Sequence, residues 1–379
     1  MCLCTSPFFV VEYVVINERR SEMYKERVNR VAAEMDKAGI SQLLVTDPDS
    51  IRYLTDIYNH PMERFWGFLI RKDGGNVLFA NRLFRLGPVD AEVVLFDDTD
   101  PVAGVVCPYL AEGTLGVDST MTARFLLPFM SRMPGLRPVL ADACVNDVRA
   151  CKDEEEQRRM IESSEINDRA MEKLMGFIRD GVTEKECAEF IMKCYAEEGC
   201  PGNAFTPIVS FGANAADPHH HADGTVLKDG DCILVDTGCV WKSYCSDMTR
   251  TFYWKYVSEE DERIYNICRD ANLLAEAEVR PGRMFKEIDL TARKHIESFG
   301  YGPSFTHRLG HSIGLADHEG EDVSSVNDHI IKPGMCFSIE PGIYLPGKTG
   351  VRVEDLVLVT EDGCRILNSF SKELMILGK

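Results

Sequence analysis

Apolar positions in the first third of the chain alternate between helical and strand spacing. At residues 24–38 they recur every three or four positions, which predicts an amphipathic helix. Short apolar runs follow, separated by turn signals such as Asp47-Pro48, and they are typical of strands. The runs lie at 42–45, 51–57, 66–70, 76–80, 92–96, 113–117 and 138–141, with helical patterns near 101–110 and 121–130. This alternation predicts an α/β domain over residues 23–150.

The rest of the chain has longer helical patterns and two hairpin patterns. The charged run at 152–159 opens a long helix that Gly181 ends. Thr183 and Glu186 form a capping box at the start of the next helix. The order helix, helix, hairpin occurs twice, which suggests an internal duplication within a second domain over residues 151–379. Its helices are expected to begin near 152, 183, 258 and 285, and its hairpins to lie within 231–252 and 335–359.

The first hairpin carries two acids. Asp236 ends an apolar run, and Asp247 lies on the returning strand. If Trp241 and Lys242 are the turn residues, the two aspartates are directly opposed, with Cβ atoms about 4.5–5.5 Å apart. Carboxylates that close repel each other unless a cation lies between them. The pair therefore suits one divalent metal, or two about 3.5–4 Å apart; the alternative is an acidic hairpin tip with solvated side chains.

The second hairpin repeats this arrangement. A loop centred near Gly347 would bring Glu340 and Glu354 opposite each other. Between the hairpins lies HRLGHSIGLADHEG, in which His311 is the best candidate for a nitrogen ligand. A lone histidine in a glycine-rich loop is more often structural, but together with four acids it favours a metal site. Two divalent cations would balance the four carboxylates, and a carboxylate-rich set with one imidazole favours Mn²⁺, Co²⁺, Fe²⁺ or Zn²⁺.

Composition excludes several classes of function. The 42 Lys and Arg against 61 Asp and Glu give a net charge of −19, which disfavours nucleic acid and anionic membranes as partners. The 14 cysteines form no CxxC pair, and their scatter suggests reduced thiols and a cytoplasmic location. No apolar run approaches the roughly 20 residues of a membrane span. Residues 1–22 lack a basic start and contain Glu12, so they are interpreted as an N-terminal extension rather than a signal peptide.

The motifs that carry these residues resemble those of the pita-bread metallopeptidases. This family includes methionine aminopeptidase, aminopeptidase P, Xaa-Pro dipeptidase (prolidase) and creatinase. The resemblance runs from about Met23 to the C-terminus, and the first domain is similar to the creatinase-type N-terminal domain. It implies an α+β pita-bread catalytic domain with peptidase activity. The matching segments are SFGANAADPHH, VDTGCVWKSYCSDMTRTF, HRLGHSIGLADHE, SIEPGIY and GVRVED.

The resemblance implies a role for each candidate ligand. Asp236 would chelate one metal ion, and Asp247 and Glu354 would bridge both ions. His311 and Glu340 would complete the shell of the other ion. A metal-bridging hydroxide would be the nucleophile, and Glu340 would also accept and pass on its proton.

Other residues would act around the metals. His219 and His318 would contact the substrate, with His219 steadying the tetrahedral intermediate or the leaving nitrogen. Arg352 would hold a ligand carboxylate, that of Asp236.

Neighbouring positions are less regular. His220 and His221 are expected to be ordinary surface residues. Ser312 and the pair Ala316-Asp317 depart from the usual family pattern and could reshape the pocket.

The choice of substrate depends on the charges near the second histidine. The complete ligand set disfavours creatinase, and the N-terminal domain disfavours methionine aminopeptidase, which leaves proline-directed peptidases. Many bacterial-type dipeptidases have an arginine four residues past that histidine, where it suits the carboxylate of a dipeptide. Here the position is Asp322, and Lys332 is the only basic residue between His318 and Glu340. The sequence thus favours aminopeptidase P, which cleaves longer peptides.

Three alternatives remain open. The first is Xaa-Pro dipeptidase, and the others are a metal-dependent hydrolase or lyase of a small non-peptide substrate and a non-catalytic binding module. The resemblance also implies a homodimer in which the N-terminal domain reaches toward the partner's pocket. Tyr58, Arg64 and Trp66 are the candidate residues for that contact. Two manganese ions and proline-containing peptides are the expected cofactor and substrate.

Overall fold

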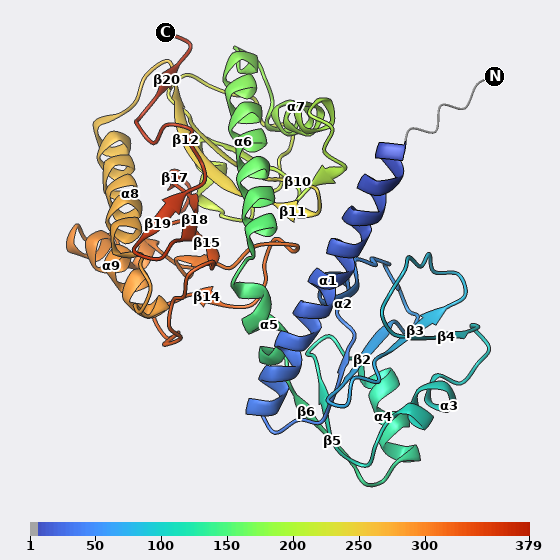
Figure 1. The fold of residues 1–379 in the computed structure, drawn as a ribbon. Helices are drawn as coiled ribbons and strands as arrows, with labels where there is room; N and C mark the ends of the chain where they lie inside the picture. Colours follow the sequence, from blue (N-terminus) through green and yellow to red (C-terminus); the bar gives the residue numbers. More distant parts are fainter. Residues whose placement is uncertain (1–6) are drawn as a thin grey trace, which may run out of the picture. The chain divides into compact units, whose positions relative to one another are not determined.

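The structure of the protein, a computed structural model, describes residues 7–379, with side chains from residue 22 onward. The chain divides into two compact units, and the division falls between Arg149 and Ala150. Both units combine helices with sheets (Figure 1). Within the part of the chain that is described, no helix is long and apolar enough to cross a bilayer.

The first unit is built on a mixed sheet with the strand order β4-β3-β2-β1-β5-β6. Helices α1 and α2 lie against one face, and α3 and α4 pack on the other (Figure 1). The strands are β1 Gln42–Val45, β2 Gly67–Arg71, β3 Val77–Asn81, β4 Glu92–Phe96, β5 Gly113–Val117 and β6 Leu136–Leu140. The helices are α1 Pro7–Lys37, α2 Pro48–Thr55, α3 Val102–Val106, α4 Ala123–Arg132 and α5 Ala143–Ala150.

Two elements of this unit differ from the prediction. The first helix begins at Pro7 instead of near residue 24, so residues 7–22 belong to it; residues 1–6 of the expected extension lie outside the described part. The apolar run at 51–57 falls largely within α2 instead of a strand. Asp47 caps this helix by accepting the Ser50 N–H at 2.8 Å, and Pro48 occupies its first turn. The residues taken as a turn signal are thus a helix start.

The residues expected to reach a partner subunit contact their own unit. Trp66 is only 2% exposed, and its ring lies 5.5 Å from that of Phe84, edge to face. So deeply buried a side chain cannot reach another subunit, and this expectation for Trp66 does not hold. Arg64 binds both carboxylate oxygens of Asp98, at 2.8 and 3.0 Å. Tyr58 is about half exposed.

The second unit has the helix and hairpin order that the sequence predicts. Thr183 and Glu186 form the expected capping box of α7, and Ser258 caps α8 by accepting the Asp261 N–H at 3.1 Å. The order helix, helix, hairpin occurs twice, as predicted. The helices are α6 Glu154–Phe177, α7 Glu184–Glu197, α8 Glu259–Glu278 and α9 Phe285–Ser298. The longer strands are β8 Ile208–Phe211, β9 Cys232–Thr237, β12 Met248–Trp254, β15 Cys336–Ile339, β16 Gly342–Leu345, β17 Thr349–Arg352 and β18 Asp355–Val359.

Each pair of helices supports one hairpin from the apolar side. Met171 of α6 and Ile191 of α7 pack in one core with Val235 of β9. Ile288 of α9 packs in another core with Phe337 of β15 and neighbouring side chains. Burying these side chains stabilises the fold by about 1.5–3 kcal/mol each. The opposite faces of the hairpins are thereby left to carry polar groups.

Candidate metal centre

The turn of the first hairpin lies one residue later than predicted. Lys242 and Ser243 form it, with φ angles of 46° and 81°, and Trp241 pairs with Tyr244. A two-residue hairpin turn of this type requires positive φ at both central positions, which a bulky residue such as tryptophan rarely adopts. Moving the turn by one residue shifts the strand pairing by two positions.

This shift changes how the two aspartates meet. Asp236 lies opposite Thr249, so the prediction that it faces Asp247 directly is wrong. Asp247 precedes Thr249 by two positions and therefore shares its face of the hairpin. The two acids are diagonal neighbours, for which Cβ separations of about 7–8 Å or somewhat less are usual. The hairpin still directs both carboxylates to one side.

The second hairpin has the predicted register. Ile339 pairs with Asp355, and Gly342 pairs with Arg352. The two ladders share one register, and two residues of each strand lie between them. Continuing that register places Glu340 opposite Glu354. The strands are interrupted at this point, between β15 and β16 and between β17 and β18.

The carboxylates of both hairpins converge on His311. Its Nε2 lies 3.5 Å from an oxygen of Asp247 and 3.5 Å from an oxygen of Glu340. Donor atoms of Asp247, His311 and Glu354 lie within 4.8 Å of one another. Together with Asp236 these residues line one cavity of about 440 Å³, which we call the metal cavity. All five predicted ligands thus surround one space.

The hydrogen bonding of these acids fits bound cations. One oxygen each of Asp236, Asp247 and Glu354 is buried and has no hydrogen-bond partner among the described residues. A buried carboxylate oxygen without a partner is unfavourable, so such groups are normally paired or coordinate metals. Four carboxylates and one imidazole are hard to borderline donors that suit divalent ions of the manganese, cobalt, iron and zinc group.

Burial shifts the pKa values of these groups. It raises the pKa of Asp247 and of Glu354 well above the usual range, and repulsion from neighbouring carboxylates adds to the effect. Burial also raises the pKa of Glu340 and lowers the pKa of His311 to about 4. The imidazole is therefore neutral, the form that binds metal. A cation among the acids would favour their ionised forms.

The buried guanidinium of Arg352 connects the two hairpins. Arg352 donates from Nη2 to Asp236 at 2.6 Å, which is the contact expected from the sequence. It also donates from Nε to the Thr249 hydroxyl at 3.0 Å and from Nη1 to the Tyr344 hydroxyl at 2.9 Å. Thr249 in turn donates to Glu354 at 2.6 Å. Acids from both hairpins are thus fixed in one network.

His307 extends this network in a way that spacing did not predict. Its Nδ1 lies 2.7 Å from the Arg308 carbonyl and its Nε2 lies 2.9 Å from the Tyr344 hydroxyl. Because a carbonyl only accepts, Nδ1 carries the proton and Nε2 accepts from Tyr344. Burial lowers the pKa of His307, which favours this neutral form.

Three further histidines line the cavity, namely His219, His221 and His318. The ring of His318 stacks on that of His311 with centroids 3.7 Å apart. Burial and the neighbouring positive groups lower the pKa of His318 to about 4, so it too is neutral. The substrate-side positions expected for His219 and His318 are therefore at the cavity wall.

His220 has a different environment from the one predicted. Its side chain is only 16% exposed, and its Nε2 lies 2.7 Å from the carboxylate of Glu184, which is fully buried. The surface interpretation of His220 is wrong, because its partner lies 36 residues earlier and sequence spacing does not reveal it. Glu184 ties the segment that carries His219 to α7, through bonds to the backbone of Phe211 and Asp223 and the side chains of Asn214 and His220.

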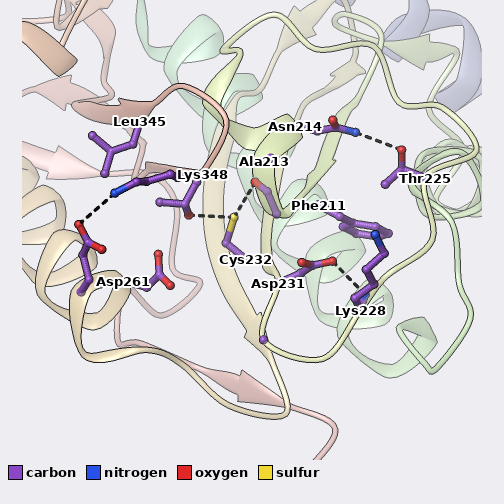
Figure 2. A pocket seen from close by; sticks show the side chains of 14 residues that line it. Phe211, Ala213, Asn214, Thr225, Lys228, Asp231, Cys232, Asp261, Leu345 and Lys348 are labelled. Atoms are coloured by element: carbon purple, nitrogen blue, oxygen red, sulfur yellow. Dashed lines mark hydrogen bonds and ion pairs between the residues drawn. The ribbon is translucent and has the colours of Figure 1, made fainter.

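A second cavity, of about 430 Å³, adjoins the same segment (Figure 2). Residues 211–214 line this cavity, whereas Pro218 and His219 line the metal cavity. Its wall carries both lysines and acids, and Figure 2 shows the Asn214 side chain directed toward Thr225. Strand β9 runs from Cys232 at the second cavity to Asp236 at the first.

The charges near His318 also differ from the prediction. Arg308 lines the metal cavity, donates to His318 Nδ1 at 3.1 Å, and has its Nη1 4.0 Å from Asp322. Its position before His311 explains why counting basic residues after His318 missed it. Asp317 lines the cavity as well, and burial with repulsion from nearby acids raises its pKa to about 7. Among the described residues, those that line the metal cavity do not include the other predicted pocket residues, Asp322, Tyr58, Arg64 and Trp66.

The fold and the converging ligands define a two-domain metal-dependent hydrolase. Residues 158–361 match metallopeptidase family M24, and residues 27–151 match the creatinase/prolidase N-terminal domain. The chain belongs to metallopeptidase family M24 and is therefore a hydrolase. The pita-bread fold and the creatinase-type first domain expected from the sequence are confirmed.

Relatives cover nearly the whole chain. An uncharacterized peptidase of Staphylococcus aureus (strain MSSA476) is 33% identical over 91% of this chain and 99% of its own. A prolidase from Thermococcus sibiricus is 32% identical with a TM-score of 0.87, covering 93% of this chain and 99% of its own. An X-Pro aminopeptidase from Thermotoga maritima is 30% identical with a TM-score of 0.82, covering 92% and 99%. Both types of proline-directed peptidase are thus similar to this chain.

Proposed function

We propose that the protein hydrolyses the bond between an N-terminal residue and a following proline. The observation that carries this proposal is the convergence of four acids and His311 on one cavity, with three carboxylate oxygens left without partners among the described residues. The similar structures of a prolidase and an X-Pro aminopeptidase support the substrate class. An Xaa-Pro bond has no N–H, so a dedicated pocket is needed to bind it.

Asp236, Asp247, His311, Glu340 and Glu354 would hold two divalent cations, with Mn²⁺ the expected ion. Bound ions of this kind supply Lewis acidity, which polarises a carbonyl and lowers the pKa of water.

The remaining steps depend on side chains of the cavity wall. Glu340 would accept a proton from the attacking water. The Ser338 hydroxyl orients the Glu340 carboxylate by donating to its Oε1 at 3.2 Å. His318 and His219 both line the cavity, the first as a neutral imidazole and the second as an exposed side chain. Each can donate to the substrate carbonyl or to the leaving nitrogen.

Arg308 favours a dipeptide as the substrate. Its side chain is 39% exposed and lies beside His318, where it can bind the C-terminal carboxylate of an Xaa-Pro dipeptide. The expectation of aminopeptidase P rested on Asp322 and on the lack of a basic neighbour, and Arg308 supplies that neighbour. Cleavage of longer peptides is the second candidate, since Asp322 would still disfavour a free carboxylate at its own position.

The test compares Gly-Pro with Gly-Pro-Ala, each with added Mn²⁺ and with a chelator. We expect metal-dependent hydrolysis of both, with higher kcat/KM for Gly-Pro. Arg308→Gln should raise KM for Gly-Pro about tenfold, since a charge-assisted bond is lost, and change KM for Gly-Pro-Ala much less. Preference for the tripeptide would instead support aminopeptidase P. No hydrolysis of either peptide by metal-loaded protein would contradict the proposal.

We further propose a cytoplasmic homodimer. The cysteines of the described residues are free thiols and most are buried, which suits a reducing compartment. Light scattering of the purified protein would give the mass of the assembly, and a monomeric mass would contradict this part of the proposal.

A further inference from the structure

Asp317 is an acid of the metal cavity that has no role among the proposed ligands. It lies in the loop between His311 and Asp322, directly before His318. Its side chain is 26% exposed, so part of it faces the open cavity. Oxygen Oδ1 is buried and has no hydrogen-bond partner within residues 22–379. Oxygen Oδ2 lies 3.6 Å from His318 Nε2, beyond hydrogen-bond distance.

The arginines that line the metal cavity, Arg308 and Arg352, bind groups other than Asp317. Arg352 donates to Asp236, Thr249 and Tyr344. Arg308 donates to His318 and approaches Asp322. Neither is paired with Asp317 in the described part of the chain.

A carboxylate in such a site needs a cation. Asp317 lines the same cavity as the acids Asp236 and Glu340, and their charges add to the effect of burial in raising its pKa. Buried charges are normally paired, because removing them from water without a partner is costly. The proposed metals would be shared by five ligands already, so the partner of Asp317 is better supplied by the substrate.

We propose that Asp317 makes the enzyme select peptides whose first residue has a basic side chain, lysine or arginine, before the proline. The inference rests on the proposed function. Asp317 is next to His318, the residue expected to contact the substrate, so it lies where the substrate enters the site. A free α-amino group is common to all Xaa-Pro peptides, and only a side-chain contact can discriminate among them.

The size of the cavity allows this contact. Its volume of about 440 Å³ lies in the range of small-molecule sites, roughly 300–1,000 Å³. A dipeptide with a lysine side chain is a ligand of that class. Aspartate paired with an ammonium or guanidinium group forms a charge-assisted hydrogen bond, which is about twice as strong as a neutral one.

The experiment uses the full-length, manganese-loaded protein and four dipeptides: Lys-Pro, Arg-Pro, norleucine-Pro and Glu-Pro. Norleucine matches the length of lysine without its charge. We expect kcat/KM for Lys-Pro to exceed that for norleucine-Pro by about tenfold or more, as sites built for a polar group reject analogues that lack it. Asp317→Asn should remove this preference and leave norleucine-Pro near the wild-type value. Asp317→Glu should retain part of it.

Glu321→Gln is the matched control, an acid-to-amide change in the same loop. Glu321 binds His329 and Asn327 and does not line the metal cavity in the described structure. This variant should keep the wild-type ratio of Lys-Pro to norleucine-Pro. Unfolding curves for each variant establish that it is folded.

Several results would overturn the inference. Equal turnover of Lys-Pro and norleucine-Pro by the wild type would do so. An equal loss on all four dipeptides in Asp317→Asn would mean that Asp317 acts on a group common to every substrate. Loss of bound manganese in this variant would make Asp317 a ligand instead. If no dipeptide is hydrolysed by the metal-loaded wild type, the proposed function fails separately, and calorimetric binding of Lys-Pro and norleucine-Pro still decides the role of Asp317.

Discussion

The two hairpins of the second unit present the same chemistry with different backbone geometry. The first has a two-residue turn at Lys242 and Ser243, and its acids are diagonal neighbours. The second has a longer turn around Gly347, and Glu340 lies opposite Glu354 at a break in the strands. A metal site does not therefore require two identical halves. It requires that each hairpin direct two carboxylates into one space and that shared contacts hold the hairpins in register.

Those shared contacts occur on both sides of the acids. Beside the cavity, Arg352 and Thr249 connect acids of the two hairpins. Away from the cavity lining, Arg250 of the first hairpin donates to Asp355 of the second at 2.6 Å and also to the Glu354 carbonyl. The C-terminal segment joins this core, since Lys372 binds Asp355 at 2.6 Å.

The largest effect is expected from removing one acid of each hairpin. Asp247→Ala and Glu354→Ala should each lower kcat/KM at least about a thousandfold, roughly 4 kcal/mol, because both are proposed to hold the metal ions. Steady-state kinetics and the manganese content of each purified variant give the result. Exposed Glu260→Gln is the control. A large loss in only one variant would show that the two hairpins contribute unequally.

Arg250 should matter more for stability than for chemistry. Its side chain and that of Asp355 are 1% and 0% exposed, so Arg250→Met breaks a buried ion pair, removes a donor to the Glu354 carbonyl and leaves Lys372 as the remaining cation at Asp355. We expect the free energy of unfolding to fall by about 3–5 kcal/mol. Urea denaturation measures this change. The surface pair Lys185–Glu189 provides the control, and Lys185→Met should change the stability by less than about 1 kcal/mol. A similar small change for Arg250→Met would contradict its role in joining the hairpins.

Much of this arrangement was predictable from local sequence. The capping box of Thr183 and Glu186 and the ligand positions of the second hairpin depend on residues close in the chain. The turn of the first hairpin was misplaced because its register depends on which residues adopt positive φ, and neither Lys242 nor Ser243 is a typical signal for that.

Contacts between residues far apart in the sequence could not be predicted from local sequence patterns. The partner of His220 is Glu184, and Arg308 reaches His318 across the loop. Trp66 is likewise buried, and its ring packs against that of Phe84 in the same unit. Such neighbours are set by the fold, so spacing along the chain carries no signal for them.

Substituting Thr249 tests the hydrogen bonds that join the two hairpins beside the cavity. Its hydroxyl accepts from Arg352 and donates to Glu354. Thr249→Val preserves the shape but removes both bonds, and we expect manganese affinity to fall about 10–100-fold, the usual effect of losing a contact that orients a ligand. Titration calorimetry of metal-free protein gives the affinity. Thr249→Ser should retain most of it, and equal losses in both variants would mean that packing, not the hydroxyl, is important.

The smallest expected effect distinguishes the turns themselves. Ser243 has a φ of 81°, a conformation that glycine adopts without strain, so Ser243→Gly should stabilise the protein by up to about 1 kcal/mol. At the second turn, Gly347 already occupies a position with a φ of 73°, and Gly347→Ala should destabilise it by at least a comparable amount. Thermal or urea unfolding of the two variants gives both signs. If the turn were instead at Trp241 and Lys242, Ser243 would lie in a strand, and glycine there would destabilise the hairpin because it loses more conformational freedom on folding. The sign of one substitution therefore decides between the two registers, and with it whether Asp236 meets Asp247 directly or diagonally.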